Sequence, residues 1–311
     1  MQLIRSADGK SGAFGVLHDL EGHDKSTKMS GHDVAIPLKD GRRLSVRAFG
    51  DPDKPLVLYF GGLISSRTEA LLFRDDRFFV VGVDRPGYGG SDHNPKQDAI
   101  SFADDIARII QEFGKTECRI FAFSGGLAFA LAFAAVRPEL VVKIGGFAGL
   151  SPAGTVPLGN SFIAKFPFFA SHPRYLWLNV NFRRLLYRFP TPLLHVLMRL
   201  DSSRLDIEKN ALTPHVLEIL MESFCEALRP GTKGLVADLR LHLGNWGGCD
   251  LTNVRAPTLL FHGVCDDVTP VVCTQWYEKN LRTCSARYFE GESHLSVPLL
   301  HSADMFDWLH A

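Results

Sequence analysis

The stretch CRIFAFSGGLAFALAFAAV (118–136) decides the fold of this chain. It begins with an apolar run typical of a strand buried on both faces, and it ends with a longer apolar run typical of a buried helix. Between them, Ser124-Gly125-Gly126 predicts a sharp turn that lifts the serine hydroxyl out of the sheet. The strand and helix backbones nearly touch at such a turn, and Ala122 and Gly126 are small enough to allow it. The pattern predicts a nucleophilic serine, and an inert serine in a packing turn is the alternative.

Apolar runs alternate with helical patterns on both sides of this stretch. Strands are predicted at 33–38, 43–49, 55–60, 78–84, 118–123, 141–149, 257–263 and 286–291. Helices are predicted at 65–73, 101–113, 126–136, 274–281 and 298–309. Asp40-Gly41 indicates a hairpin turn between the first two strands, and Ser101 and Asp104 are spaced as a capping box for the second helix. Strands that alternate with helices predict a mostly parallel, eight-stranded sheet flanked by helices.

The alternation stops in one long segment, where helical patterns broken by Pro and Gly replace the strands. An insertion of that size predicts a helical cap over the sheet edge, and such lids commonly gate a site. Residues 1–30 precede the first predicted strand, and we expect them to be an N-terminal extension of unknown role. We expect residues 31–150 and 250–311 to form the core, and residues 151–249 to form the cap.

A serine hydroxyl becomes a good nucleophile only when a base takes its proton and a carboxylate orients that base. In a fold with a serine at this type of turn, the acid and then the histidine follow later in the chain, each after a strand. FHGVCDDVTP places Asp266 just after one predicted strand, with Asp267 as a neighbouring alternative, and GESH places His294 after the last strand. The order and spacing predict a triad of Ser124, His294 and Asp266.

Acyl transfer also needs N–H donors for the oxyanion of the tetrahedral intermediate. The residue after the nucleophile supplies one, here Gly125, and the loop after an earlier strand supplies the other. In YFGGLISSR, Gly61-Gly62 allow a tight turn that presents the N–H of Leu63. A plain turn at the end of the strand is the alternative interpretation of these two glycines.

Six segments of the chain together resemble a known protein family. They are YFGGLISSRTEA (59–70), VDRPGYGGSD (83–92), AFSGG (122–126), GLVADLRLHLGNWG (234–247), FHGVCDDVTP (261–270) and GESH (291–294). The chain from about Asp33 onward resembles the α/β-hydrolase superfamily, in its capped branch with proline-iminopeptidase-like and esterase-like members. It departs from the family pattern at Gly61, where many members have histidine, and at Ala122, which replaces the first glycine of the turn. The resemblance implies the α/β-hydrolase fold with an inserted helical cap.

The predicted function is that of a serine hydrolase. His294 would deprotonate Ser124, an acyl-enzyme would form, and water would release the acid, most simply in a carboxylesterase. An amidase, an aminopeptidase-like enzyme or a C–C bond hydrolase could use the same triad. A non-catalytic ligand sensor with this fold is the alternative from another class. Serine at position 124, rather than aspartate, argues against haloalkane dehalogenase and epoxide hydrolase chemistry. The substrate is expected to be a small molecule, and no cofactor or metal motif is visible.

The predicted cap has an unusual composition. Segment 161–190 contains nine aromatic residues, and seven basic residues without any acidic one lie between 140 and 200. One interpretation is that the aromatics pack against the sheet edge while the arginines face water. The other is a lid that favours an apolar acyl or aromatic substrate, with an anionic substrate or contact with a lipid interface as further options.

Composition limits the remaining possibilities. The chain has 311 residues, 46% of them hydrophobic, and equal numbers of acidic and basic side chains, 34 each. This balance argues against a nucleic-acid partner and indicates an ordinary folded protein. The six cysteines form no CxxC pair, so we expect free thiols and a cytoplasmic location. We expect no membrane span, because the apolar run at 120–136 is interrupted by Ser-Gly-Gly. The sequence leaves open whether the protein forms a homodimer.

Overall fold

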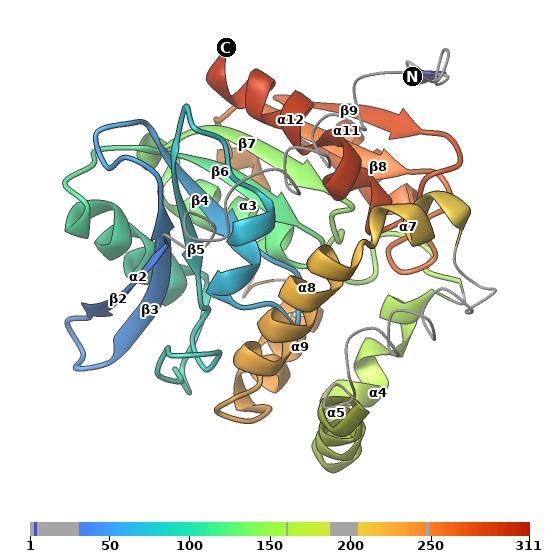
Figure 1. The fold of residues 1–311 in the computed structure, drawn as a ribbon, viewed down its shortest axis with the longest axis horizontal. Helices are drawn as coiled ribbons and strands as arrows, with labels where there is room; N and C mark the ends of the chain where they lie inside the picture. Colours follow the sequence, from blue (N-terminus) through green and yellow to red (C-terminus); the bar gives the residue numbers. More distant parts are fainter. Residues whose placement is uncertain (1–2, 5–30, 160, 187–204, 245, 247–248) are drawn as a thin grey trace.

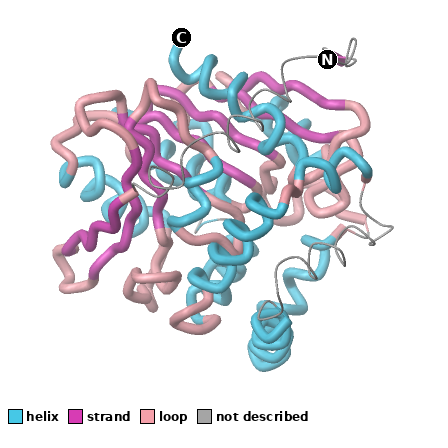
Figure 2. The backbone as a smooth tube through the Cα atoms, in the orientation of Figure 1, coloured by secondary structure: helices cyan, strands magenta, loops and turns pink. Residues whose placement is uncertain are grey.

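The computed structural model describes residues 3–4, 31–159, 161–186, 205–244, 246 and 249–311. The predicted extension at 1–30 therefore lies outside the described residues, apart from Leu3–Ile4, which pair with a strand at the edge of the sheet. The described elements form a central sheet with helices on both of its faces, as Figures 1 and 2 show.

The sheet confirms the predicted architecture. Its strands are β1 (Leu3–Ile4), β2 (His32–Pro37), β3 (Arg43–Phe49), β4 (Leu56–Phe60), β5 (Phe79–Val83), β6 (Cys118–Phe123), β7 (Val141–Phe147), β8 (Thr258–Gly263) and β9 (Cys284–Phe289). They lie in the order β1-β9-β8-β7-β6-β4-β5-β3-β2. Strand β3 runs antiparallel to both of its neighbours, and the other neighbouring pairs are parallel. The eight predicted strands correspond to β2–β9, and β1 adds a two-residue edge.

Nine α-helices are described. They are α2 (Ala99–Glu112), α3 (Gly126–Val136), α4 (Phe166–Ser171), α5 (Pro173–Leu186), α7 (Asp206–Ala211), α8 (Pro214–Ala227), α9 (Lys233–Leu243), α11 (Val272–Asn280) and α12 (Ser296–His310). The segment predicted as a helix at 65–73 is instead a short 3₁₀ helix, η1 (Arg67–Leu72). Other 3₁₀ helices are η2 (Pro138–Leu140), η3 (Phe162–Lys165) and η4 (Leu251–Asn253).

Alternate residues of the central strands pack on opposite faces of the sheet. In β6, Ile120 and Ala122 join the core that contains α2 and α3, whereas Phe121 and Phe123 join the core that contains α12. Both faces are covered, so the central strands are apolar throughout rather than alternating with polar residues. This explains the continuous apolar runs seen in the sequence.

The capping prediction for α2 was wrong by three residues. Asp98, rather than Ser101, is the N-cap: its carboxylate accepts the Ser101 N–H at 2.7 Å, and the Ser101 hydroxyl accepts the Asp98 N–H at 3.0 Å. Asp104 instead forms an ion pair with Arg137. Both Asp and Ser are good N-caps, and the helix begins at the earlier of the two because Asp98 and Ser101 satisfy each other's N–H groups.

Between β7 and β8, the described residues form helices and no strand. Residues 151–249 are called the helical insertion below. Helix α8 packs along η1, where Ser66 N–H donates to Ser223 Oγ at 2.9 Å and Arg67 pairs with Glu226 at 2.7 Å. Helices α4 and α5 lie at the far side of the molecule from the sheet (Figure 1). Among the described residues, no helix combines the length and apolar character needed to cross a membrane.

The start of α3 requires glycine because it passes very close to β4. A side chain at Gly126 would place its Cβ 2.1 Å from the carbonyl oxygen of Phe60 and 2.6 Å from that of Gly61. Backbone atoms cannot move aside as a flexible side chain can, so this contact excludes any larger residue.

We expect Gly126→Ala to lower the free energy of unfolding by about 1–3 kcal/mol, the usual cost of overpacking. In an unhindered helix, the same change would stabilise the protein by roughly 0.5–1 kcal/mol. The matched control is Gly62→Ala, whose Cβ would meet its nearest neighbour at an ordinary 3.5 Å. Urea unfolding of both variants measures the difference. If Gly126→Ala is as stable as the unsubstituted protein, the close contact is not a constraint.

Candidate active site

Ser124 lies on the turn between β6 and α3 in a strained backbone conformation. Its φ angle is 53°, in the left-handed region that side-chain-bearing residues rarely adopt. Its N–H donates to the carbonyl of Phe147 in the neighbouring strand β7 at 2.8 Å. This turn places the side chain at the carboxyl end of the sheet, where it is partly exposed to a cavity.

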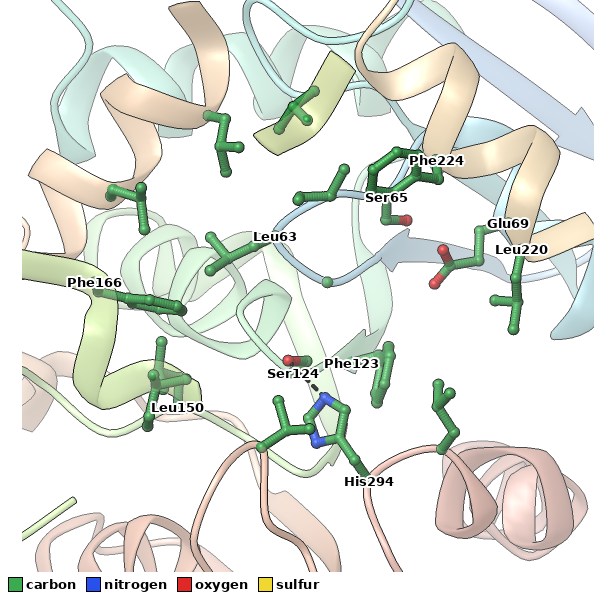
Figure 3. A pocket seen from close by; sticks show the side chains of 18 of the residues that line it. Leu63, Ser65, Glu69, Phe123, Ser124, Leu150, Phe166, Leu220, Phe224 and His294 are labelled. Carbon is green, nitrogen blue, oxygen red and sulfur yellow. Dashed lines mark hydrogen bonds between the residues drawn. The ribbon is translucent and has the colours of Figure 1, made fainter. Parts of the chain in front are cut away.

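The structure brings Ser124, His294 and Asp266 into one hydrogen-bonded chain. The Ser124 hydroxyl lies 3.0 Å from His294 Nε2, and His294 Nδ1 lies 2.7 Å from Asp266 Oδ2 (Figure 3 shows the serine–histidine contact). The residues come from the loops after β6, β8 and β9, as the sequence pattern predicts. The side chain of Phe123 packs beside the imidazole, with ring centroids 4.9 Å apart.

The Asp266 carboxylate is held by several donors. Its Oδ1 accepts the N–H groups of Val268 and Thr269, at 2.9 and 2.8 Å. Burial alone would raise its pKa, but the charge of His294 and the hydrogen bonds from His262 and His294 outweigh burial, so its pKa is lowered. The group therefore stays ionised around neutral pH and can orient the imidazole.

The structure distinguishes the two candidate acids. Asp266 is buried, and its neighbour Asp267 is exposed to solvent. Of the two, only Asp266 contacts His294 among the described residues. The buried His262 supports the same loop: its two ring nitrogens contact Thr274 Oγ1 at 2.7 Å and the carbonyl of Thr269 at 2.8 Å.

The two residues predicted to bind the oxyanion, Gly125 and Leu63, lie close to each other. A Cβ built on Gly125 would lie 3.5 Å from the nitrogen of Leu63, so the loop after β4 approaches the turn at Ser124. Within the described part of the chain, neither the N–H of Gly125 nor that of Leu63 donates a hydrogen bond. Both are therefore available to a ligand, and their role in an oxyanion hole stays a prediction.

A buried arginine holds the loop after β4. Arg85 is 1% exposed, and its guanidinium donates to the carbonyls of Gly61, Gly62 and Leu63 at 2.7–3.0 Å. It also forms an ion pair with Asp238 of α9 at 2.9 Å and lies over the rings of Tyr88 and Phe129. The carbonyls of the loop are turned toward the guanidinium and are thereby fixed. The sequence alone does not show the pairing of Arg85 with Asp238, because the two residues lie 153 positions apart.

The site opens into a cavity of about 320 Å³. It is lined by Ser124 and His294, by the loop after β4 and by side chains of the helical insertion (Figure 3). The insertion contributes Ile163, Phe166, Phe169, Leu176, Asn179, Val180, Leu212, Leu217, Leu220, Met221, Phe224, Leu235 and Leu239. Most of these side chains are apolar, so the cavity fits an uncharged, apolar part of a ligand.

The aromatic residues of α4 and α5 do not all pack inward. Phe166 and Phe169 line the cavity, whereas Phe168, Tyr175 and Trp177 are about half exposed to solvent. Phe182 is 60% exposed. The interpretation that these aromatics are all buried against the sheet edge is therefore wrong for the outer face of α4 and α5.

No described group of three or more His, Cys, Asp or Glu side chains is arranged to hold a metal ion. All six cysteines are free thiols.

The sequence analysis did not identify Glu69, a buried acid of η1 that lines the cavity. The sequence offered one hint of it, because Glu69 lies in the segment that directly follows Gly61-Gly62 and the predicted oxyanion loop.

Comparison with known proteins gives both local and global matches. A family model described as the alpha/beta hydrolase fold matches residues 55–187. A 2-(acetamidomethylene)succinate hydrolase from Mesorhizobium japonicum is 34% identical over 120 residues, which are 37% of this chain and 42% of that protein. An sn-1-specific diacylglycerol lipase from Mus musculus is 28% identical over 114 residues, which are 35% of this chain and 36% of that protein. In these matches, the chain spans less than half the length of each relative.

The structural match covers nearly the whole chain. The esterase RhEst1 from Rhodococcus sp. ECU1013 superposes with a TM-score of 0.64 over 91% of this chain and 99% of that one, at 17% sequence identity. At that identity, the match shows a shared fold and leaves the reaction open. The matched family model over residues 55–187, the strand order and the shared fold together show that the chain has the α/β-hydrolase fold.

Proposed function

We propose that this protein is a serine hydrolase that cleaves a carboxylic ester through an acyl-enzyme. The observation that carries the proposal is the hydrogen-bonded chain from Asp266 through His294 to Ser124, whose serine and histidine line an apolar cavity. The match of residues 55–187 to the alpha/beta hydrolase family model supports it, as do the two partial relatives, which are a succinate-derivative hydrolase and a lipase.

In this mechanism, each member of the triad has a separate role. Asp266 accepts the Nδ1–H of His294 and thereby leaves Nε2 free to accept the Ser124 proton. As Ser124 Oγ attacks the ester carbonyl, the proton passes to Nε2, and the imidazolium then donates it to the leaving alcohol. In the second half-reaction, His294 takes a proton from water, the water oxygen attacks the acyl-enzyme, and His294 returns the proton to Ser124 as the acid is released.

The developing oxyanion would be bound by the N–H groups of Gly125 and Leu63. Such donors are effective only when they are fixed before the reaction, because then no reorganisation is needed in the transition state. Gly125 is fixed by the start of α3, and Leu63 by the Arg85 contacts with its own carbonyl and the two before it. The geometry thus supports a preorganised hole in which Arg85 positions the loop and does not touch the substrate.

We further propose that residues 151–249 act as a cap on a core formed by residues 31–150 and 250–311. The insertion supplies more than half of the side chains that line the cavity, and most of them are apolar. This composition supports an apolar acyl or aromatic ester as the substrate. A ligand sensor would need the cavity but not a hydrogen-bonded serine, histidine and aspartate, so the geometry favours an enzyme.

The substrate class can be tested with p-nitrophenyl esters. We expect kcat/KM to rise from acetate to about butyrate or hexanoate, because each buried methylene contributes roughly 0.8 kcal/mol until the cavity is full. Ser124→Ala is the control and should lower kcat by about 10³–10⁶ while the protein stays folded. A steady fall in kcat/KM from acetate onward would contradict an apolar acyl site. Ester hydrolysis that survives in Ser124→Ala would contradict the mechanism.

The acid can be tested with a matched pair of adjacent substitutions. Asp266→Asn should lower kcat by roughly 10⁴, because the histidine loses the partner that holds its tautomer and orientation. Asp267→Asn removes the same charge one residue away, on an exposed side chain, and should change kcat little. Steady-state kinetics with circular dichroism spectra of both variants separates a catalytic loss from unfolding. Equal losses in the two variants would show that Asp266 is not the triad acid.

A further inference from the structure

A second carboxyl group faces the same cavity as Ser124. Glu69 of η1 is only 5% exposed, and it lines the cavity next to Ser65. Figure 3 shows both side chains on one side of the cavity and the Ser124–His294 pair on another. Almost every other lining side chain nearby, such as Leu220 and Phe224, is apolar. Ser65 and Glu69 are called the polar corner below.

The partners of Glu69 are hydroxyl groups. Tyr59 donates to Oε1 at 2.6 Å, and Ser223 of α8 donates to Oε2 at 3.1 Å. Ser223 Oγ itself accepts the N–H of Ser66, so its own proton is free to point at the carboxylate. Ser65 also hydrogen-bonds to the carboxyl group. A carboxylate has about four lone-pair sites, so these three bonds still leave acceptor capacity for a ligand in the cavity.

Unlike the buried acids Asp84 and Asp238, Glu69 forms no direct ion pair among the described residues, and the charge of Arg85 acts on it only from farther away. Asp84 pairs with Arg67 at 2.7 Å, and Asp238 pairs with Arg85 at 2.9 Å. No ion pair of Glu69 is found among the described residues, and burial raises the pKa of its carboxyl. A buried carboxylate without a cation is costly, and the usual remedy is a paired charge. Here, the open side of the carboxyl faces the space that a ligand would fill.

We propose that the polar corner is a subsite for a primary ammonium group at the end of the substrate remote from the scissile ester. The ammonium would donate to Glu69 and supply a directly paired cation, which no described residue does. The apolar walls would contact the intervening carbon chain, so the preferred substrate would be an ω-amino acyl ester rather than a plain alkyl or an ω-carboxy ester. This inference rests on the proposed esterase function and adds the chemical class of its substrate.

The test compares pairs of esters that differ only at the far end of the acyl chain. For wild-type protein, kcat/KM is measured with p-nitrophenyl 6-aminohexanoate against heptanoate, and with 8-aminooctanoate against nonanoate. We expect at least one ω-amino ester to be preferred by about tenfold or more, as a hydrogen bond to a charged group allows. The ω-carboxy ester of the same length should be the poorest substrate, because it would place a second negative charge beside Glu69.

The variant Glu69→Gln keeps the shape and an acceptor oxygen but removes the charge. We expect it to abolish the preference for the ω-amino ester while hydrolysis of the alkyl ester continues. Glu226→Gln on α8 is the matched control, since Glu226 pairs with Arg67 and does not line the cavity. It should leave the ratio of the two substrates unchanged. If Glu69 only supports the fold, Glu69→Gln will reduce both substrates in parallel, and the inference is wrong.

A binding measurement separates this inference from the esterase proposal. In Ser124→Ala, which need not turn over any ester, hexylammonium and octylammonium should raise the melting temperature more than hexanol and octanol do. This effect should disappear in the double variant with Glu69→Gln. Hydrolysis of alkyl esters without any ammonium preference or binding would overturn the subsite and leave the esterase proposal intact. Ammonium binding through Glu69 without any hydrolysis would support the subsite and overturn the esterase.

Discussion

The close approach of helix α3 to strand β4 is the constraint on which the rest of the molecule depends. Gly126 has no side chain, and the carbonyl oxygens of Phe60 and Gly61 occupy the space where one would lie. The helix can therefore begin directly over the sheet, and the residue two positions earlier must turn sharply to reach it. That residue is Ser124, with a left-handed φ of 53°, a conformation that costs on the order of 1–3 kcal/mol. Burial of nearly all of α3 between the sheet and its neighbours offsets this strain.

The same constraint brings the loop after β4 to the serine. Gly61 and Gly62 follow the strand that α3 touches, and Leu63 then lies beside Gly125. Arg85 fixes this loop through three carbonyls, and its ion pair with Asp238 connects the loop to α9 of the helical insertion. The position of α9 is thereby linked to the loop that presents the N–H we propose for the oxyanion. Removing one partner of a buried ion pair typically costs about 3–5 kcal/mol, so the pair is expensive to break.

Much of the fold and the triad could be predicted because each feature leaves a local signal. Strands covered on both faces are continuously apolar, and the serine, aspartate and histidine follow strands in a fixed order. The sequence even favoured Asp266 over Asp267, and the structure buries the first and exposes the second.

Other features depend on residues far apart in the chain and left no such signal. The pairing of Arg85 with Asp238 and that of Glu69 with Ser223 become visible only when the insertion folds back onto the core. Composition alone could not say which aromatics of α4 and α5 face inward. Aromatic residues lie on several faces of these helices, and no acidic residue marks the face that is exposed to solvent. The start of α2 was misplaced because Asp98 and Ser101 are both good caps, and only their mutual hydrogen bonds decide between them.

The central claim is that Ser124 is a nucleophile activated by His294, and covalent labelling tests it most directly. Wild-type protein treated with a fluorophosphonate and digested should contain a single phosphonylated peptide, with the modification at Ser124. The rate of labelling should fall by orders of magnitude in His294→Ala, because the serine then has no base. Labelling at another residue would contradict the account, as would the absence of labelling in folded wild-type protein, or a rate that does not depend on His294.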